Sequence, residues 1–495
     1  MEHEFSGADS LVYSCLRETS KMLSNSAKPV WDIVQSLEAG FHKLSDDIWD
    51  HPELNYQEFY AANAHRAQLD AHGFRVTEGL SGIPTALMGE AGEGGPVIAI
   101  LGEFDALPGL SQEAGLSVQQ PIALGASGHG CGHHLLGSAS LLAAVAVKQW
   151  LVENKLQGRV RYYGCPAEEG GSSKSFLVRD GAFEDVDVAI SWHPAGFMGV
   201  YNPVSLACVE LEFTFHGLAS HASAAPHLGR SALDAVELMN VGVNYMREHM
   251  PTSARVHYAM IDGGGISPNV VQPRAVVRHL VRARTLGEMW ELVARVKKIA
   301  DGAALMTETS VEVNQLSGEA NIVANAVLEN AMQENLLQLG GPGFDDADRQ
   351  FAKQIQSSLS IDDIRAAYIR FGFPSSDESL SEQVAPLYGA STDGIGSTDV
   401  GTVSWVVPTV QCRVSCYAAG TPYHSWQLVA QGKAPAAHKG LTQAAKAMAG
   451  LASDLIKQPA LLTAAKAEFA QFRENHSFIN PVGPEAKPAL RMSMK

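Results

Sequence analysis

Three short apolar runs, each ending in a polar cluster, constrain the fold of this chain most. Residues 96–101 lead into Gly-Glu-Phe-Asp, residues 160–163 into Cys-Pro-Ala-Glu-Glu, and residues 186–192 into His193. Strands that are apolar on both faces are typical of the interior of a parallel sheet. Helical patterns lie between them, so the sequence predicts an α/β domain with a mostly parallel sheet flanked by helices. Ligands of such sheets gather beyond the carboxyl ends of the strands, where these polar clusters lie.

The pattern changes near residue 206, where apolar and polar residues alternate from Val209 to Phe215. This period of two predicts a strand with one covered face. Helical and strand-like patterns follow in the order β-α-β-β-α-β, which is typical of a split ferredoxin-like unit. We therefore expect the α/β domain in two parts, 1–205 and 317–495, an inserted α+β domain at 206–316, and an insertion near 337–395 with a short helix at 361–369. The proline-rich C-terminus is expected to be a frayed tail.

Composition narrows the classes of partner. The chain has 36 Lys+Arg against 53 Asp+Glu, a formal net charge of −17, which argues against nucleic acids and anionic membranes as main partners. Six cysteines in 495 residues are too few for a disulfide framework. The N-terminus lacks a secretory leader pattern, and polar residues interrupt the apolar stretch at 135–152. We expect a soluble cytoplasmic protein in which that stretch is a buried helix.

The segment from Gly128 to His134, Gly-His-Gly-Cys-Gly-His-His, is the most informative about chemistry. Because glycines separate the larger residues, His129, Cys131 and His133 can converge on one point without a steric clash. Thiolate and imidazole groups are ligands that suit zinc and its neighbours in the divalent series. The alternative is a buried cysteine and histidines that are satisfied by hydrogen bonds. Such a density of potential ligands favours a metal site.

Two adjacent carboxylates, Glu168 and Glu169, follow directly after the run at 160–163. Neighbouring side chains at a strand end point to different sides, so one can bind a metal while the other faces a bound water. That division provides the Lewis acid and the general base of metal-assisted hydrolysis. The alternative is a solvated acidic turn, which the apolar strand before the pair disfavours.

Further candidates are weaker when each is taken alone. His193 ends an apolar run, where a buried core histidine would give the same pattern. His424 lies in a Gly/Pro-rich loop, where an ordinary surface histidine would give the same pattern. Glu103 and Asp105 follow the first strand and are expected to orient imidazoles, unless they only cap a turn. The sequence has no Gly-x-Ser-x-Gly elbow and no His-Glu-x-x-His pair, and the glycine that a phosphate loop needs before its lysine is Ser173.

Taken together, these motifs resemble those of the aminoacylase-type metallopeptidases, over about residues 45–450. The resemblance is to the branch of N-acyl-amino-acid amidohydrolases, indole-acetyl-amino-acid hydrolases and aminobenzoyl-glutamate hydrolases, and is strongest to the last. The motifs that carry it are His51-Pro-Glu-Leu-Asn-Tyr-Gln-Glu58, Asp105-Ala-Leu-Pro108, His129-Gly-Cys-Gly-His133, Pro166-Ala-Glu-Glu169, His193-Pro194, Gly217-Leu-Ala-Ser-His221-Ala222, Gly263-Gly-Gly-Ile-Ser-Pro-Asn269-Val-Val271 and Thr421-Pro-Tyr-His424-Ser425.

The resemblance implies an enzyme with two divalent metal ions per subunit, zinc or manganese, and assigns roles to the candidates. The implied ligands are Cys131, His133, Glu169, His193 and His424. Glu168 is the implied general base. Glu103, Asp105 and His129 are implied to orient the ligands without binding the metal themselves. The sequence departs from many relatives at His134, where they have an acid.

The inserted domain is similar to the lid and dimerisation domain of that family. The resemblance implies that His221 reaches the partner's site in a homodimer and stabilises an oxyanion. It also implies that Asn269 and Arg282 bind the substrate carbonyl or carboxylate, with Arg284 as the alternative to Arg282.

The expected activity is hydrolysis of a small-molecule amide, an N-acyl or N-aroyl amino acid of the aminobenzoyl-glutamate kind. Two alternatives stay open: a dipeptidase of the same fold, and a non-catalytic partner subunit of a heteromeric hydrolase. A scaffold has no need of a general base, so the presence of Glu168 and Glu169 argues against the second alternative.

Overall fold

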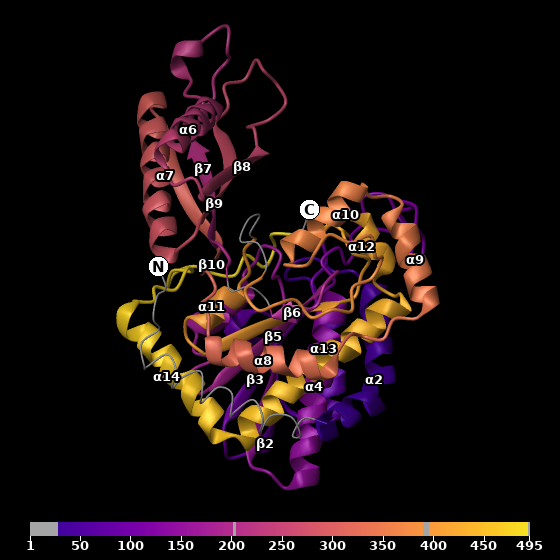
Figure 1. Ribbon diagram of the computed structural model, residues 1–495. Helices are drawn as coiled ribbons and strands as arrows, with labels where there is room; N and C mark the ends of the chain where they lie inside the picture. The colour runs from indigo at the N-terminus through magenta and orange to yellow at the C-terminus, as the bar shows by residue number, and fades with distance from the viewer. Residues whose placement is uncertain (1–27, 201–203, 390–395, 494–495) are drawn as a thin grey trace, which may run out of the picture.

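The computed structural model describes residues 28–200, 204–389 and 396–493. It consists of a large α/β body from which a smaller α+β unit projects (Figure 1). The body contains a seven-stranded sheet in the order β1-β2-β4-β3-β5-β11-β6, and the smaller unit a four-stranded sheet in the order β10-β7-β9-β8.

The large sheet is mixed, with a parallel centre, as the apolar runs predict. Strands β4, β3, β5 and β11 pair in parallel, whereas β1, β2 and β6 are antiparallel to their neighbours. The strands are β1 (Arg75–Glu78), β2 (Leu87–Glu93), β3 (Val97–Glu103), β4 (Gly158–Cys165), β5 (Val188–Ala195), β6 (Gly199–Val200) and β11 (Thr409–Ser415). The side chains of β3 are buried on both faces because helices cover the sheet on both sides.

Two groups of helices cover the large sheet. One face packs against α4 and α13, with α2 behind them, and the other against α5 and α11. The helices of the body are α2 (Lys28–Trp49), α3 (Phe59–Ala71), α4 (His133–Asn154), α5 (Ser173–Arg179), α8 (Ala326–Leu339), α9 (Asp346–Gln356), α10 (Ile361–Arg370), α11 (Val400–Ser404), α12 (Trp426–Gln431), α13 (Pro435–Lys457) and α14 (Pro459–Asn475).

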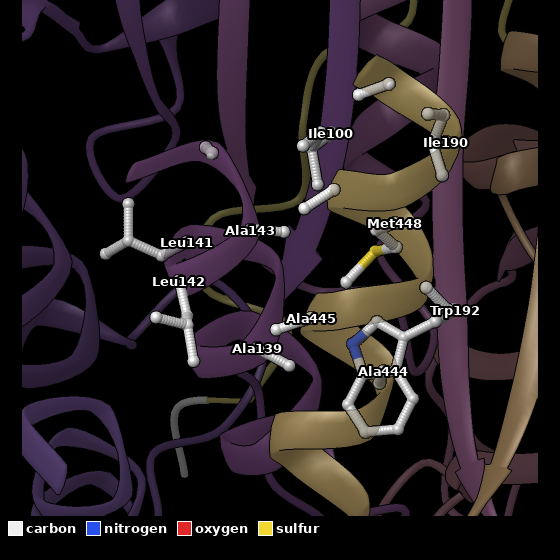
Figure 2. Packing of buried hydrophobic residues seen from close by; sticks show 14 of the residues in the cluster. Ile100, Ala139, Leu141, Leu142, Ala143, Ile190, Trp192, Ala444, Ala445 and Met448 are labelled. Carbon is white, nitrogen blue, oxygen red and sulfur yellow. The ribbon is translucent and has the colours of Figure 1, made fainter. Parts of the chain in front are cut away.

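Helix α4 is the centre of the core. Small alanine side chains on α4 and α13 let the two helices lie close together against the sheet, where they meet Ile100, Ile190 and Trp192 (Figure 2). The helix is long and apolar enough to cross a membrane, but 83% of its apolar window is buried inside the protein. Its apolar character therefore reflects its place in the core, as expected from the sequence.

The smaller unit has the observed order β-α-β-β-α-β. Its elements are β7 (Ala207–His216), α6 (Ala232–Met246), β8 (Arg255–Asp262), β9 (Arg274–Ala283), α7 (Leu286–Thr307) and β10 (Ser310–Glu319). The alternation in β7 has the expected cause, since Leu211, Phe213 and Phe215 are buried under the helices and the residues between them are half-buried. Strand β10 continues past residue 316 to Glu319.

The first and last strands of the unit run side by side. Strands β7 and β10 pair with each other, so that Cys208 lies opposite Glu319 at the base of the unit. The Glu319 carboxylate is buried there, and its Oε2 accepts a hydrogen bond from Ser172 Oγ at 3.3 Å. Burial raises the pKa of Glu319 to about 8, with a further rise from Asp399 that Arg282 opposes.

In the described part of the segment at 337–395, two helices follow the end of α8, where the sequence predicts only the one that is now α10. Helix α9 is amphipathic but polar overall, and its buried stripe includes only a few apolar residues, such as Ala352 and Ile355, so its apolar signal in the sequence is weak. Its start does have a local signal, because the side chains of Asp345 and Asp348 form a reciprocal capping box.

The C-terminal segment is not the frayed tail that its prolines predict. Val482 is buried against the face of the sheet that α5 and α11 cover. Arg179 Nη1 donates a hydrogen bond to the carbonyl of Ala486 at 2.5 Å, and Gln57 Nε2 to that of Leu490 at 2.8 Å. Side chains of the body thus supply the contacts that order this segment.

The described cysteines form no disulfide, in agreement with their sparse distribution. Cys131, Cys165, Cys208, Cys412 and Cys416 are free and buried. Cys15 lies outside the described residues.

We predict that Glu319→Gln makes the stability of the protein less dependent on pH. A carboxyl whose pKa is raised by folding stabilises the fold fully below its unfolded pKa of about 4.3, and that contribution is lost as the pH rises towards 8. The unfolding temperature of the parent protein should therefore fall by about 2 °C or more relative to Glu319→Gln between pH 6 and 8.5, measured by calorimetry. Glu312→Gln, at an exposed position of the same strand, is the control. Parallel profiles for parent and Glu319→Gln would contradict the assignment.

Candidate metal centre

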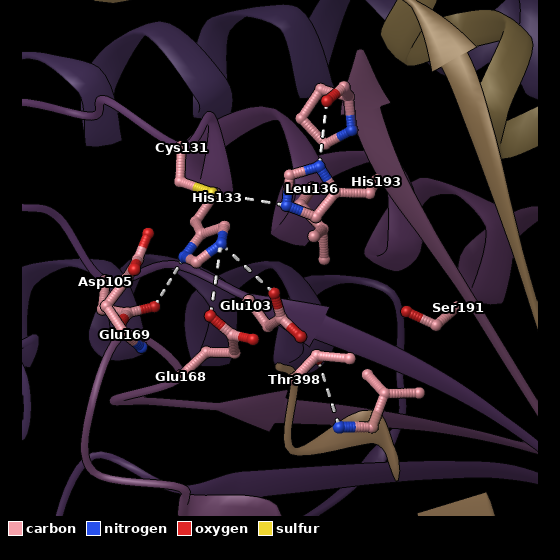
Figure 3. Close-up of polar contacts among 12 residues, drawn as sticks. Glu103, Asp105, Cys131, His133, Leu136, Glu168, Glu169, Ser191, His193 and Thr398 are labelled. Atoms are coloured by element: carbon pink, nitrogen blue, oxygen red, sulfur yellow. Dashed lines mark hydrogen bonds and ion pairs between the residues drawn. The ribbon is translucent and has the colours of Figure 1, made fainter. Parts of the chain in front are cut away.

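The carboxyl ends of the parallel strands bring the candidate ligands to one edge of the large sheet (Figure 3). Strand β3 ends at Glu103, β4 leads into Glu168 and Glu169, β5 contains His193, and the loop after β11 contains His424. Cys131 and His133 lie at the start of α4, which follows β3 in the chain. Parallel strands end at the same edge, so residues far apart in sequence meet there.

Two sets of ligand atoms share Cys131. The ligand atoms of Cys131, His133 and His193 all lie within 4.8 Å of one another, and those of Cys131, Glu169 and His424 do as well. Cys131 Sγ is 3.4 Å from His193 Nε2, and His424 Nε2 is 3.1 Å from Glu169 Oε1. A soft thiolate between imidazole and carboxylate ligands fits two neighbouring divalent ions.

Unusual backbone conformations place these ligands. Gly132 has φ +87° directly after Cys131, and a Cβ atom there would lie 2.2 Å from Tyr417 Oη, so only glycine fits. Ala167 and His424 also adopt positive φ angles of 54° and 56°. Such strain in residues other than glycine is typical of functional sites. The His424 N–H donates to the carbonyl of Gly130 at 2.9 Å, which joins the His424 loop to the Cys131 segment.

Asp105 orients His133 towards the centre. Its Oδ1 lies 2.7 Å from His133 Nδ1, and its Oδ2 accepts from the N–H of Glu169 at 2.9 Å. His133 Nε2 is left buried without a hydrogen-bond partner among the described residues. Although burial alone would lower it, Cys131 and Asp105 raise the pKa of His133 well above its ordinary value. An imidazole that attracts a proton so strongly fits a position where a metal cation takes the place of the proton.

Glu168 belongs to neither set that contains Cys131, but its ligand atom forms a third set with those of Glu103 and His133, all within 4.8 Å of one another. Its Oε2 is 3.9 Å from His133 Nε2. Burial, followed by the charges of Glu103 and Glu169, raises the pKa of Glu168 well above its ordinary value. A carboxylate that takes up a proton readily and lies next to a metal site is suited to general-base catalysis.

A buried lysine beside the centre was not identified from the sequence. Lys174 Nζ lies 2.6 Å from Glu103 Oε1 and 2.6 Å from Asp399 Oδ1, and all three side chains are buried. Burial opposes the charged form, but Asp399 and Glu103 raise the pKa of Lys174 well above its ordinary value. No local pattern links residues 225 positions apart, so the sequence offers no signal for this ion pair.

Another buried carboxylate, Glu58, supports the loop that carries Glu168. Its Oε1 accepts from the N–H groups of Tyr56 at 2.9 Å and Ala167 at 2.8 Å. Thr85 Oγ1 donates to its Oε2 at 3.1 Å. Burial, with a further contribution from Asp105, raises the pKa of Glu58 to about 8. The motif that ends in Glu58 contributes to the family resemblance, but this supporting role could not be inferred from the sequence.

His129 and His134 lie apart from the ligand sets. His129 Nε2 is 3.1 Å from the carbonyl of Ile48, and His134 Nε2 is 3.0 Å from that of Gly432. Their rings pack against each other with centroids 4.9 Å apart. The spacing allowed His129 to converge with Cys131 and His133, but the structure turns it towards α2 instead. His134, the departure from related sequences, is likewise turned away.

The remaining candidates lie in the smaller unit. His221 and Asn269 are exposed in adjacent loops, where Ala222 N–H donates to the carbonyl of Asn269 at 3.0 Å. These loops follow β7 and β8 at the end of the unit that is far from the large sheet (Figure 1). Arg282 lies at the opposite end of β9, across from Cys208 and near Glu319. Within one chain, Arg282 therefore does not meet His221 and Asn269.

This chain is similar to known proteins in its family profile and over most of its sequence. The profile of the family described as Peptidase family M20/M25/M40 matches residues 99–485. The chain is 44% identical to one of the subunits of p-aminobenzoyl-glutamate hydrolase from Escherichia coli, over 92% of this chain and 98% of the relative. It is 30% identical to Xaa-Arg dipeptidase of Mus musculus over 88% of this chain and 90% of the relative.

A solved structure shares the fold. The crystal structure of a dinuclear metal binding peptidase of the M20 family from Bacillus subtilis matches with a TM-score of 0.53 and 18% sequence identity. The match covers 86% of this chain and 99% of that protein.

We predict that Lys174→Met destabilises the protein by about 3–5 kcal/mol, because it leaves Glu103 and Asp399 buried without their cation. Denaturant unfolding with chelator present measures this effect without any contribution from metal binding. Lys353→Met, at an exposed position on α9, is the matched control. Equal stability of both variants would show that the buried ion pair is not needed.

Proposed function

Since this chain belongs to peptidase family M20/M25/M40, we propose that it is a hydrolase that uses two divalent metal ions to cleave the amide bond of N-acyl or N-aroyl amino acids. The observation that carries the proposal is the pair of ligand sets that share Cys131, with Glu168 beside them. The first set contains His133 and His193 and the second Glu169 and His424. Zinc and manganese both suit this mixture of donors.

The residues of the proposed site have different roles in hydrolysis. Two ions, when bound, supply a Lewis acid for the amide carbonyl and acidify a water molecule. Glu168 is proposed to accept the proton of the attacking water and to return it to the leaving nitrogen. Asp105 holds His133 in the orientation that presents Nε2 to the centre. Glu58 holds the strained loop on which Glu168 stands.

The sequence relatives support the choice of substrate. The relative at 44% identity, aligned over 92% of this chain, is named as part of a p-aminobenzoyl-glutamate hydrolase, and the substrate in that name is an aroyl amino acid. We propose that Asn269, which lies beside His221 at the tip of the smaller unit, binds the substrate carbonyl in the site of a second copy, because this tip is far from the centre of its own chain (Figure 1). The position of Arg282 beside Glu319 gives no support to a role in binding the substrate carboxylate, and we leave it out of the proposed site.

A dipeptidase is the second candidate, because an Xaa-Arg dipeptidase is 30% identical over most of the chain. Turnover of p-aminobenzoyl-glutamate and of a dipeptide with C-terminal arginine, measured side by side, separates the two. A non-catalytic partner in a heteromeric hydrolase is the third candidate. The presence of Glu168 beside His133, in addition to the two ligand sets that share Cys131, argues against it.

We propose that two copies associate through the smaller unit. The outer edge of β8 has no strand partner among the described residues, and Tyr258 and Met260 on it are exposed. An unpaired edge with exposed apolar side chains is suited to pairing with another chain. Association would allow His221 of one copy to reach the centre of the other. Since the bacterial relative is named as one of two different hydrolase subunits, a homologous chain is the alternative partner.

Glu168→Gln should keep its metal and lose about 10²–10⁴-fold in kcat, because the amide cannot accept the proton. Elemental analysis of the purified variant measures the metal, and p-aminobenzoyl-glutamate cleavage the rate. Retention of both metal and substantial turnover would refute the assignment of the base.

His221→Ala should lose about 10²–10³-fold in kcat through the missing oxyanion donor. Mixed with the Glu168→Gln variant, it should recover activity that neither variant has alone, because one site of each mixed dimer then has both residues. His249→Ala, exposed on the same unit, is the control. If the mixture shows only the sum of the separate activities, His221 does not act across the dimer.

A further inference from the structure

The two ligand sets differ in how their histidines are held. His133 and His193 belong to α4 and β5, and the side chain of His133 is 0% exposed. The side chain of His424 is 51% exposed and lies on a loop. Packing around the imidazole therefore does little to hold His424, whose position depends on the path of the loop between β11 and α12.

The insertion binds the backbone of that loop at Ala419. Gln356, buried at the end of α9, donates from Nε2 to the carbonyl of Ala419 at 3.1 Å. The same amide donates to the carbonyl of Glu378 at 3.1 Å. The Ala419 N–H in turn donates to the carbonyl of Ser379 at 2.8 Å. The backbone N–H and carbonyl of Ala419 therefore both form hydrogen bonds with the insertion.

The loop between β11 and α12 also packs against the insertion through apolar side chains. Ala418 is buried with Phe344 and Ile355, and Ala419 with Ile364 and Tyr368. Gly420 follows with φ +88°, and a Cβ atom there would lie 3.1 Å from the Cα of Ile364. The loop therefore runs so close to α10 that its path leaves little freedom.

We propose that the insertion at 337–395 positions His424, and that Gln356 is the positioning residue that connects the two. This inference rests on the proposed two-metal function. Loss of the Gln356 hydrogen bonds should weaken the ion held by Cys131, Glu169 and His424. The ion held by Cys131, His133 and His193 should be unaffected, because none of the contacts of Gln356 involves those elements.

The test is Zn²⁺ binding to metal-free Gln356→Met, which keeps the length of the side chain and removes both donated hydrogen bonds. Titration calorimetry with Zn²⁺ alone should find two sites in the parent protein. In the variant, one site should weaken about 10–100-fold, the usual effect of losing a residue that orients a ligand, and the other should stay unchanged. Gln354→Met, at an exposed position two residues earlier on the same helix, should match the parent.

The outcomes separate this inference from the proposed function. Two unchanged sites in Gln356→Met would overturn the positioning role and leave the two-metal centre intact. Equal weakening of both sites would also overturn it, since that is the result of general destabilisation. A parent protein that binds fewer than two Zn²⁺ ions would instead refute the two-metal function. If Gln356→Met does not fold, Ile364→Ala removes most of the buried side chain that packs with Ala419 and is judged by the same selective loss.

Discussion

Charge compensation at the carboxyl edge of the large sheet is the interaction on which the rest of the structure depends. The carboxylates of Glu58, Glu103, Asp105 and Asp399 are all buried near one another, and Glu168 lies among them. Buried carboxylates this close repel one another unless protons or cations neutralise them. Lys174 supplies one cation, to Glu103 and Asp399. His133 Nε2 lies 3.4 Å from Glu103 Oε2 but forms no hydrogen bond among the described residues. Bound divalent ions would compensate the negative charge that remains and would give this nitrogen a partner.

The parts of the chain around this edge are held in different ways. Helix α4 begins at the centre with His133 and runs back through the core beside α13, with both helices packed against the sheet, so the buried ligands lie on well-packed elements. His424 lies on a loop, and contacts between this loop and the insertion hold it in position. His221 lies far away at the tip of a unit that is joined to the body by two paired strands. A well-packed centre with loops and inserted parts around it is a common way to build an active site on an α/β fold.

Sequence patterns predicted the features that repeat with a local period or stand in compact motifs. The runs at β3, β4 and β5 are apolar on both faces because helices cover both sides of the sheet, and the alternation in β7 follows from one covered face. Helix α9 was not predicted because a mostly exposed helix carries few apolar residues. The C-terminal segment resembled a frayed tail because its order comes from Arg179 and Gln57, side chains more than 300 positions away.

By itself, the sequence determined the fold class and the residue types of the candidate ligands, because both follow from patterns of residues that lie close together along the chain. Tertiary structure alone decided which of the histidines converge: His133 meets Cys131, while His129 turns to Ile48, although both are two residues from the cysteine. It also decided that Lys174 neutralises Glu103 and Asp399, and that Arg282 lies at the base of the smaller unit and not at its tip. The direction of a side chain and its distant partner follow from the path of the whole backbone, which no local pattern encodes.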